Sequence, residues 1–424
     1  MDLQMMRNFI AILEEELVPA MGCTEPIALA YAAAKGREVL AAVPDRIVAR
    51  CSGNIIKNVR CVSIPNSQGM TGVESAVVLG AFGGDASRRM EVLEAVRSAD
   101  LEATRTFLDA KKCTVEYLES DIPLHFIIDL YSGENAVSVE VRHAHTNITS
   151  VARNGEVIYS VDADTPEAAL ADRSALSIEN IKCFADEVEL SLIRPLLDKQ
   201  IRCNMDIAYE GISGQYGLQI GRTIRASYAD GVVTRMKAYA AAASEARMAG
   251  CDMPVIINSG SGNQGIASSV PVIVYARERD IPQERLYRSL AFSGLLTICQ
   301  KEFIGKLSAF CGAVSASCAA GAAITYMEGG TIEQIKDTID NTLANIPSIL
   351  CDGAKISCAA KIASCVDAAM MAHFLSMQGK AYKAFTGLLK EEAGETISCV
   401  GYIGKVGMRE TDREIVKLML DDLS

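Results

Sequence analysis

The sequence contains no tryptophan, and aromatic residues make up only 5% of its 424 positions. Proteins that bind single-stranded nucleic acid use such side chains as stacking platforms. Acidic residues outnumber basic ones by 53 to 41, which gives a formal net charge of −12. Surfaces that bind nucleic acid or anionic membranes are usually positive. We therefore expect a small-molecule partner, and neither nucleic acid nor a membrane.

Common catalytic motifs are absent as well. The chain has no Walker A loop, no GxSxG nucleophile elbow and no HExxH zinc motif. The spacing of its four histidines is not that of a metal-binding quartet; they are His125, His143, His145 and His373. Because His143 and His145 are two positions apart, we expect them to face the same side of one strand.

The N-terminal stretch and the cysteine count indicate a compartment. Glu14, Glu15 and Glu16 fall where a signal peptide needs an unbroken apolar core. Fourteen cysteines without a secretion signal are typical of reduced thiols in the cytosol. The run Leu307–Met327 is long enough to cross a membrane, but its Gly, Ser, Thr and Cys content favours a buried helix of a globular protein. We expect a soluble, cytoplasmic protein.

The hydrophobic periodicity changes twice along the chain. Residues 1–16 and most of the chain after 165 have helical spacing, whereas the region between them contains short alternating runs. RIVARCS and RCVSIP predict two strands, and five further runs in residues 113–160 predict an antiparallel meander. We therefore predict an α+β fold. A mainly helical domain, 1–44 with 165–424, carries an inserted α/β domain, 45–164, that contains an antiparallel sheet.

Five of the fourteen cysteines lie between Leu307 and Cys365, in LSAFCGAVSASCAAGAAITYM and CDGAKISCAAKIASC. Small, uncharged residues dominate the first of these segments, so helix backbones can pack closely and leave room for a bulky group. Three or four thiolates that converge there would suit an iron–sulfur cluster. Buried core cysteines are the alternative, because free Cys is among the most buried residue types and no CxxCxxC run is present.

Two further segments are candidates for chemistry. Cys23 lies just before a helix that Pro26 is expected to start, where the helix dipole and free amides would lower a thiol pKa. It is a candidate reactive thiolate, with a structural cysteine as the alternative. The loop NSGSGNQG (258–265) has three glycines and donor-rich side chains that suit an anion. An ordinary surface loop is the alternative reading of this loop.

Six segments spread along the chain resemble a single family: GCTEP (22–26), HTNI (145–148), NSGSGNQG (258–265), LSAFC (307–311), CDGAKISC (351–358) and ETDREI (410–415). They are similar to segments of the L-cysteine desulfidases, the iron–sulfur relatives of the alpha chain of bacterial L-serine dehydratase. The cysteine spacing is the most specific part. Cys351 follows Cys311 by 40 positions (351 − 311) and Cys358 follows Cys351 by 7 (358 − 351), as in that family. The segment CSGNIIKNV departs from the family pattern at Gly53 and Val59.

The resemblance implies one 4Fe-4S cluster held by Cys311, Cys351 and Cys358, within the helical domain. Cys318 and Cys365 could each replace a ligand, but the family pattern favours their being core residues. Three protein thiolates leave one iron open, and an open iron acts as a Lewis acid that holds the substrate and polarises its leaving group.

The resemblance also implies a reaction. It is the β-elimination of L-cysteine, which gives sulfide, ammonia and pyruvate. Cys23 would be the base that removes the Cα proton. The residues expected to contact the amino-acid substrate are Asn258, Ser259, Ser261, Asn263 and His145.

Two other functions remain open at this point. An L-serine or L-threonine dehydratase would need the same iron and base but would expel water. A non-catalytic iron–sulfur redox sensor would need neither an open iron nor a base, so Cys23 beside the glycine-rich loop counts against it. The sequence also leaves open whether the chain forms a homodimer.

Overall fold

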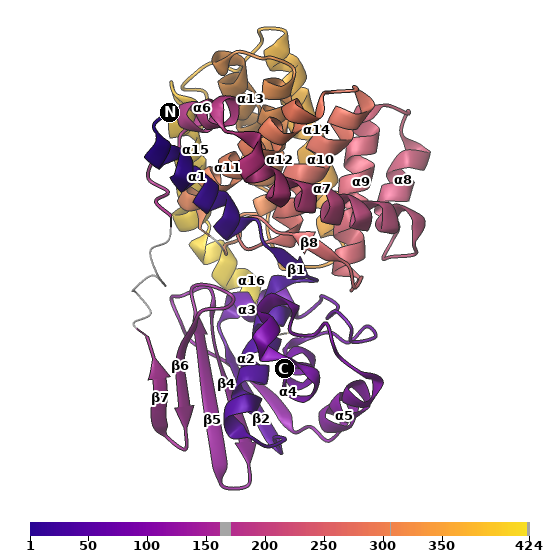
Figure 1. Cartoon of the computed structure of the whole chain (residues 1–424), viewed down its shortest axis with the longest axis vertical. Coiled ribbons are helices and arrows are strands. Elements are labelled where there is room, and N and C mark those ends of the chain that lie inside the picture. The colour runs from indigo at the N-terminus through magenta and orange to yellow at the C-terminus, as the bar shows by residue number, and fades with distance from the viewer. Residues whose placement is uncertain (162–170, 306, 422–424) are drawn as a thin grey trace.

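The structure, a computed structural model, describes residues 1–161, 171–305 and 307–421. It has two lobes, one built of helices and the other around a sheet (Figure 1). The chain leaves the helical lobe after α1 (Leu3–Glu16) and β1 (Pro19–Met21) and returns to it after the last strand of the sheet. The predicted fold class, α+β with a mainly helical part and an antiparallel sheet, is confirmed.

The sheet lobe contains six strands, and all its helices precede the second of these strands in the chain. The strands are β2 (Arg46–Cys51), β3 (Cys113–Tyr117), β4 (His125–Ser132), β5 (Asn135–Arg142), β6 (Ile148–Arg153) and β7 (Glu156–Ser160). The helices are α2 (Thr24–Leu40), α3 (Gly53–Val59), α4 (Val73–Gly83), the 3-10 helix η1 (Ala86–Glu91) and α5 (Ser98–Asp109).

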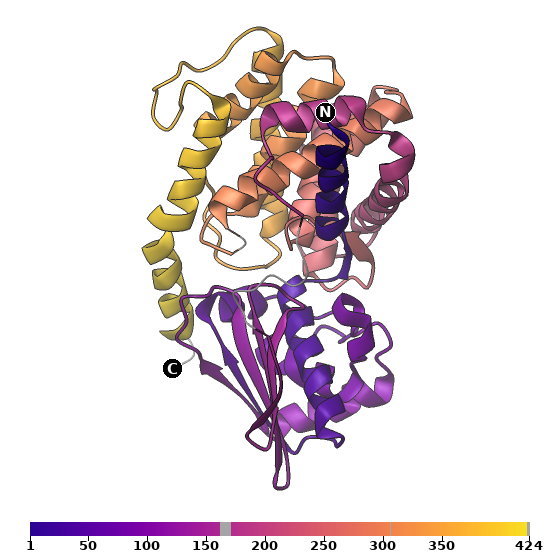
Figure 2. The same ribbon diagram turned by 60° about the vertical axis from the view of Figure 1, so that its left-hand side comes forward.

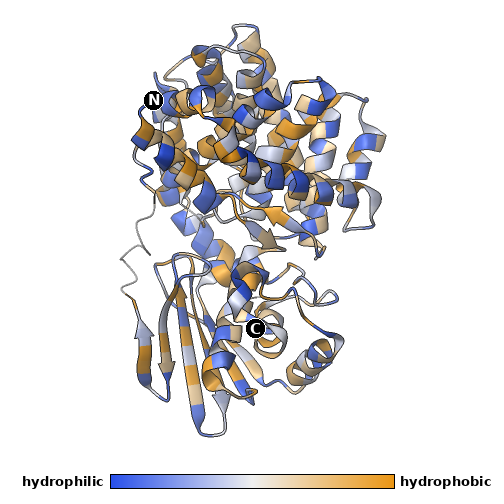
Figure 3. Ribbon diagram, viewed as in Figure 1, coloured by the Kyte–Doolittle hydropathy of each residue, from blue (hydrophilic) through white to orange (hydrophobic). Residues whose placement is uncertain are grey.

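The sheet has the order β3-β2-β4-β5-β6-β7. Val137, Val139 and Val141 alternate along β5 and are buried, while the residues between them are partly exposed, as expected for a strand with one covered face. Hydrophobic and hydrophilic residues accordingly alternate along the strands in Figure 3. The cover is α2, whose Gly36 lies so close to the sheet that a Cβ would be 2.4 Å from Leu130 Cδ1.

The sheet lobe differs from the sequence prediction around β2. RIVARC forms β2, but RCVSIP forms no strand, and GNIIKN belongs to α3. The spacing of Ile55, Ile56 and Val59, all buried, suits one face of a helix. The predicted five-strand meander comprises only β4 to β7, because β3 pairs with β2 in parallel. A parallel pair needs a long crossover, which α3, α4 and α5 supply.

The helical lobe is formed by the remaining elements of the chain. They are α6 (Ile178–Glu187), α7 (Leu190–Ser213), α8 (Ile220–Ser227), α9 (Val232–Met248), β8 (Pro254–Ile256), α10 (Gly262–Glu278), α11 (Gln283–Ile304), α12 (Gly312–Met327), α13 (Ile332–Asn345), α14 (Cys358–Met377), α15 (Ala393–Tyr402), the π-helical turn η2 (Ile403–Gly407) and α16 (Arg409–Asp421).

Helix α12 is part of the core of this lobe and packs against α10, α11, α13 and α14. All its residues from Ala313 to Met327 are buried, and a Cβ at Gly321 would lie 2.9 Å from Ala369 Cβ on α14. The run Leu307–Met327 is not one helix. Because α12 begins at Gly312, it has 16 residues, fewer than the roughly 20 that a membrane span needs. Within the described ranges, α14 is the helix long and apolar enough to cross a membrane by length and composition alone, and 56% of its apolar window is buried.

The packing groups the chain differently from the predicted domain limits. The sequence assigns residues 1–44 to the helical domain, but Ile27, Leu29 and Leu40 of α2 belong to the hydrophobic core of the sheet lobe. The difference arises because the small, apolar residues of α2 form the cover of the sheet. The predicted second limit, between 164 and 165, lies outside the described residues. The domain division itself stays a prediction.

Helix α16 joins the two lobes, and a strand pair of the helical lobe leads to their junction. Helix α16 leaves the helical lobe and runs alongside the sheet lobe (Figure 2), where Asp412 accepts hydrogen bonds from Asn54 and Lys57 of α3. Strand β1 pairs with β8, with Pro19 opposite Ile256. This pairing brings together the segments that follow the two strands, namely Cys23 and the loop 258–265.

Candidate active site between the two lobes

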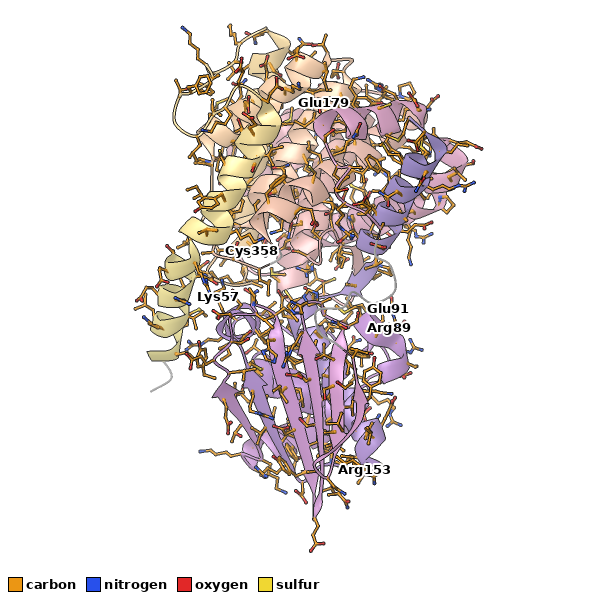
Figure 4. All side chains as sticks on the ribbon, turned by 90° about the vertical axis from the view of Figure 1, so that its left-hand side faces the viewer. Lys57, Arg89, Glu91, Arg153, Glu179 and Cys358 are labelled. Atoms are coloured by element: carbon orange, nitrogen blue, oxygen red, sulfur yellow. The ribbon has the colours of Figure 1, made fainter. Side chains whose placement is uncertain are left out.

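A cavity of about 820 Å³, including the space at its open mouth, lies where the lobes meet. Figure 4 labels Cys358 on the helical lobe and Lys57 on the sheet lobe, near this junction. The cavity is lined by Cys23, Thr24, Glu25, Asn58, His145, Arg247, Ser259, Gly260, Ser261, Asn263, Gln264, Lys301, Leu307, Ser308, Phe310, Cys311, Gly312, Ala313, Cys351, Gly353, Ala354, Cys358 and Ile362.

Four helices begin at the wall of this cavity. Cys23 is the N-cap of α2, Ser261 of α10 and Cys311 of α12, and Cys358 is the first residue of α14. The N-terminus of a helix carries unpaired N–H groups and a partial positive charge. Four such termini at one cavity favour the binding of anionic groups there.

The backbone holds Cys311 and Cys351 side by side. The Cys311 N–H donates to the Ile349 carbonyl at 2.9 Å, and the Cys351 N–H donates to the Ala309 carbonyl at 2.7 Å. Phe310 and Leu350 form an antiparallel bridge between these bonds. Cys358 follows after a short loop, and its own N–H donates to the Lys355 carbonyl at 2.9 Å. We refer to these two segments, 309–312 and 349–358, as the thiol side of the cavity.

Lys57 holds the loop that carries Cys351 in place. Its side chain is 1% exposed and pairs with Asp412 at 2.5 Å. It also donates to the Cys351 carbonyl at 3.4 Å. Gly353 has a positive φ of 98° and packs so closely that a Cβ there would be 2.2 Å from the Lys57 carbonyl oxygen. The loop that carries Cys351 is therefore fixed against α3, and α3 is fixed against α16.

The thiols of Cys311 and Cys351 share a hydrogen bond. This bond, with Lys57 and Lys361 nearby, holds the pKa of Cys351 below its usual range. The same bond and burial raise the pKa of Cys311. Burial also raises the pKa of Cys358, against the influence of the Lys355 backbone and Lys361. The Cys311 thiol therefore favours the ionised form of Cys351.

The three thiols of the thiol side fit the implied cluster by donor type and by setting. Soft sulfur donors line one cavity next to cations and helix N-termini that stabilise thiolates. No group of three or more His, Cys, Asp or Glu side chains in the described ranges is arranged to hold a metal ion. A four-iron cluster is larger than one ion, so its ligands stand further apart. The assignment of Cys311, Cys351 and Cys358 as ligands stays a prediction.

The other two cysteines of the same sequence region lie elsewhere. Cys318 and Cys365 are 0% exposed and belong to the core of the helical lobe. Neither lines the cavity. Burial raises the pKa of each thiol to about 12, so they are neutral core side chains in this arrangement.

Cys23 lies on a different part of the wall. This part comprises Cys23, residues 244–248 of α9 and the loop 258–263, and we call it the Cys23 side. Its Sγ lies 3.8 Å from Met248 Sδ. Helix α2 begins after Cys23, as predicted, but the predicted lowering of the thiol pKa is wrong. Burial raises the pKa of Cys23 to about 12, and the nearby Arg247 guanidinium opposes this only in part. Loss of hydration outweighs the stabilisation of a thiolate at the helix N-terminus.

The glycine-rich loop forms a tight turn before α10. Asn258 and Ser261 exchange backbone hydrogen bonds of 3.1 and 3.0 Å, and Ser259 and Gly260 between them both have positive φ, as in a type I′ turn. Ser259, Ser261 and Asn263 line the cavity. Asn258 does not, because its side chain is buried and donates to the Gly294 carbonyl at 3.1 Å. We therefore correct the expectation for Asn258, which orders the loop from behind.

The connection between β5 and β6 places His145 at the cavity. Strand β5 ends at Arg142, so His143 and His145 lie in the connection and not on one strand face as predicted. His145 lines the cavity, and a Cβ at Gly260 would lie 3.2 Å from its Cε1. The sheet lobe thus contacts the glycine-rich loop of the helical lobe through this histidine.

Several polar residues of the cavity were not identified from the sequence. They are Glu25, Asn58, Arg247 and Gln264. Arg247 is the one basic residue in the run AAAASEARM, and a charge in an alanine-rich buried helix needs an explanation. Glu25 and Gln264 lie within GCTEP and NSGSGNQG, but nothing in those motifs assigned a role to their side chains. Asn58 comes from a segment with ordinary composition, and only the fold brings it to the cavity.

The fold and the cavity define a class of protein: two lobes, mainly helical, with a cysteine-lined site at their junction that favours anions. Comparison with known proteins gives the family. The chain belongs to the serine dehydratase alpha chain family, whose model matches residues 87–417.

Close relatives cover nearly the whole chain. A UPF0597 protein of Lachnoclostridium phytofermentans is 47% identical over 417 residues, which cover 98% of this chain and all of the relative. UPF0597 proteins of Desulfitobacterium hafniense and Treponema denticola are each 44% identical, over 99% and 98% of this chain and 97% and 98% of their own lengths. The predicted relation to the serine dehydratase alpha chain is confirmed. Membership supports a lyase of the amino-acid dehydratase type with an iron–sulfur cofactor.

Proposed function

We propose that this protein is an iron–sulfur-dependent lyase that eliminates the β-substituent of an α-amino acid, with L-cysteine as the substrate. The products are sulfide, ammonia and pyruvate. One observation carries the proposal: three clustered thiols, a separate thiol at a helix N-terminus and a donor-rich loop all line one cavity. A redox sensor has no need for the second and third of these features.

Cys311, Cys351 and Cys358 would hold the 4Fe-4S cluster. When bound, the cluster would supply an open iron that acts as a Lewis acid toward the leaving group of the substrate. The residues around the thiols keep them oriented: the bridge at Phe310 and Leu350 fixes two of them, and the start of α14 fixes the third.

Cys23 is the proposed base. Its thiolate Sγ would accept the Cα proton, and the electron pair of the Cα–H bond would form the Cα–Cβ double bond as the Cβ–sulfur bond breaks. The sulfur leaves with its electron pair as sulfide. The aminoacrylate product then tautomerises, and water hydrolyses it to pyruvate and ammonia. Cys23 must be ionised first, and burial makes this costly at neutral pH. A thiolate with a high pKa is, in return, a strong base toward a weakly acidic proton.

The substrate would lie against the glycine-rich loop. Ser259 and Ser261 line the cavity, and the Asn263 side chain is fixed because its Oδ1 accepts from Ser244 Oγ at 3.0 Å and from Arg247 Nη1 at 3.2 Å. His145 closes this region from the sheet lobe. These residues would position the Cα–H bond toward Cys23 and exclude water from it.

L-Serine is the second candidate substrate, and the family description favours it. The same base and the same cavity would serve its dehydration, in which hydroxide leaves in place of sulfide. L-Threonine would follow the same course.

Product analysis on anaerobically reconstituted protein tests the proposal. L-Cysteine, L-serine and L-threonine are offered separately, and sulfide, ammonia and 2-oxo acid are measured. Sulfide and pyruvate in equal amounts from L-cysteine support the desulfidase. Much faster pyruvate release from L-serine assigns the dehydratase instead. Protein that binds its cluster but releases no 2-oxo acid from any of the three rules out the lyase. The cytoplasmic location and a homodimer remain proposals, which fractionation and light scattering test.

A further inference from the structure

Arg247 is buried at the cavity without a counter-charge. It lies in the last turn of α9 and is 2% exposed. The guanidinium passes so close to Gly262 that a Cβ there would be 2.2 Å from Arg247 Nε. Because Gly262 has no side chain, the guanidinium has room to reach the cavity wall.

The hydrogen bonds of Arg247 are incomplete. Its Nη1 donates to Asn263 Oδ1 at 3.2 Å, and the guanidinium also forms a hydrogen bond with the Cys23 thiol, while its buried Nε has no partner. In the described part of the chain, no carboxylate forms an ion pair with it. Glu25 of the cavity wall accepts from Thr24 and Asn58, and Glu245 of α9 accepts from the backbone of Leu218 and Ile220.

Such an arrangement is costly unless an anion completes it. A guanidinium keeps its charge in proteins, and an unpaired buried charge destabilises the fold by several kcal/mol. Gln264, also in the cavity wall, has a buried Oε1 without a partner. This oxygen is an acceptor and calls for a donor, such as the ammonium group of an amino acid. Arg247 contacts the first turn of α10 at Gly262, where the helix N-terminus also favours negative charge.

The shape of the guanidinium suits an anion such as a carboxylate or a phosphate, and the proposed amino-acid substrate supplies a carboxylate. Its planar fork matches a carboxylate, which it can bind through two parallel hydrogen bonds. The guanidinium lies beside Asn263 and the Cys23 thiol, and its charge also acts on the Cys358 thiol. The thiols of Cys311 and Cys351 already have each other and Lys57 and Lys361. The carboxylate is therefore expected from a ligand on the Cys23 side.

We propose that Arg247 binds the α-carboxylate of the substrate, so that the cavity selects amino acids with a free carboxylate. This inference rests on the proposed function. A carboxylate held at Arg247 would set the attached Cα next to Cys23, because the same guanidinium lies beside the Cys23 thiol.

Binding of unreactive ligands to the anaerobically reconstituted protein tests the proposal. L-Alanine has the α-carboxylate but no leaving group, and L-alaninamide lacks the carboxylate. Calorimetric titration should give binding of L-alanine at least about 100-fold tighter than that of L-alaninamide, the scale expected when one partner of a buried charge pair is removed. R247Q should weaken L-alanine binding by about 100-fold and R247K, which keeps the charge but not the fork, by about tenfold.

Two controls accompany the titration. R225Q removes an exposed arginine of α8 and should leave L-alanine binding unchanged. Iron content and the visible absorption of the cluster should stay at the wild-type level in R247Q and R247K. This second readout separates substrate binding from a role in holding the cluster.

Three outcomes would overturn the inference. One is equal binding of L-alanine and L-alaninamide by the wild type, which needs no variant. Another is an R247Q protein that binds L-alanine as the wild type does. The third is an R247Q protein that loses iron but keeps its L-alanine affinity, since Arg247 would then neutralise the thiolates. The proposed function fails separately, if the wild type binds L-alanine through Arg247 but releases no 2-oxo acid.

Discussion

Two cysteines of the cavity, Cys351 on the thiol side and Cys23 on the Cys23 side, lie in opposite electrostatic settings, although the pKa values of Cys311 and Cys358 on the thiol side are raised as well. Cys351 has a hydrogen-bond donor in Cys311 and two lysines nearby, and its pKa is lowered. Cys23 has Arg247 nearby but also Glu25, and burial raises its pKa to about 12. Both lie close to helix N-termini, so the terminus alone does not decide the protonation state of a thiol. Hydrogen-bond donors, cations and hydration decide it.

The difference bears on the two proposed roles. A metal ligand must lose its proton when the metal binds, and the lowered pKa of Cys351 favours that loss. A thiol that acts as a base must be ionised first, and burial makes this step costly for Cys23. The following predictions test this division of roles, beginning with the largest expected effect.

Removal of a thiol on the thiol side should abolish the cluster. In wild-type protein, anaerobic reconstitution should load about four irons per chain. Cys311→Ala, Cys351→Ala and Cys358→Ala should each leave substoichiometric iron and no lyase activity, because the site loses one of three ligands. Cys318→Ala is the matched control and should keep its iron. The ligand assignment is wrong if Cys318→Ala strips the cluster while Cys311→Ala retains it.

Removal of the Cys23 thiol should leave the cluster in place but reduce the activity. Cys23→Ala should keep full iron content but lose about 10²–10⁴ in the rate of 2-oxo acid release, the typical contribution of a general base. Exchange of the substrate Cα proton with solvent deuterium, followed by NMR, should slow in parallel. A Cys23→Ala protein that turns over at the wild-type rate would assign the base to another residue and end the comparison.

Loss of the ion pair between Lys57 and Asp412 should lower the stability of the fold. Lys57→Met leaves Asp412, 14% exposed, without its ion-pair partner. We expect a loss of about 3 kcal/mol in the free energy of unfolding, as for other buried pairs that lose one member, and faster loss of iron. Urea denaturation and iron release measure these effects. Lys35→Met breaks the exposed pair with Glu38 and should cost less than about 1 kcal/mol. Equal effects of the two substitutions would remove the support role from Lys57.

The pH dependence of Cys23 reactivity gives the smallest effect and the most direct one. Iodoacetamide reacts with the thiolate only. Because the pKa of Cys23 is raised to about 12, its thiolate fraction should increase about tenfold per pH unit from pH 7 to 10 without a plateau. Peptide mass spectrometry of the cluster-loaded protein measures the rate, with the exposed Cys61 as an internal reference. A plateau that begins below pH 8 would show that Arg247 and the helix terminus outweigh burial.

Much of the site was accessible from the sequence because its segments are contiguous motifs. GCTEP, NSGSGNQG and CDGAKISC each carry residues that line the cavity. Local rules also predicted the start of α2 near Pro26 and the antiparallel strands β4 to β7. These rules did not predict α3, which forms because Ile55, Ile56 and Val59 bury one face of a helix. They also did not predict that the Asn258 side chain donates to the Gly294 carbonyl.

The sequence by itself determined the supply of thiols, their spacing and the family to which the chain belongs. Tertiary structure decided which groups meet. Lys57 reaches Cys351, and Arg247 reaches Cys23, from segments that are far away along the chain. The sign of a pKa shift depends on hydration and on charges within a few ångströms, and neither is written in the order of residues. For that reason the position before Pro26 predicts a thiolate, whereas the fold makes Cys23 a buried thiol beside Arg247, with which no carboxylate of the described residues forms an ion pair.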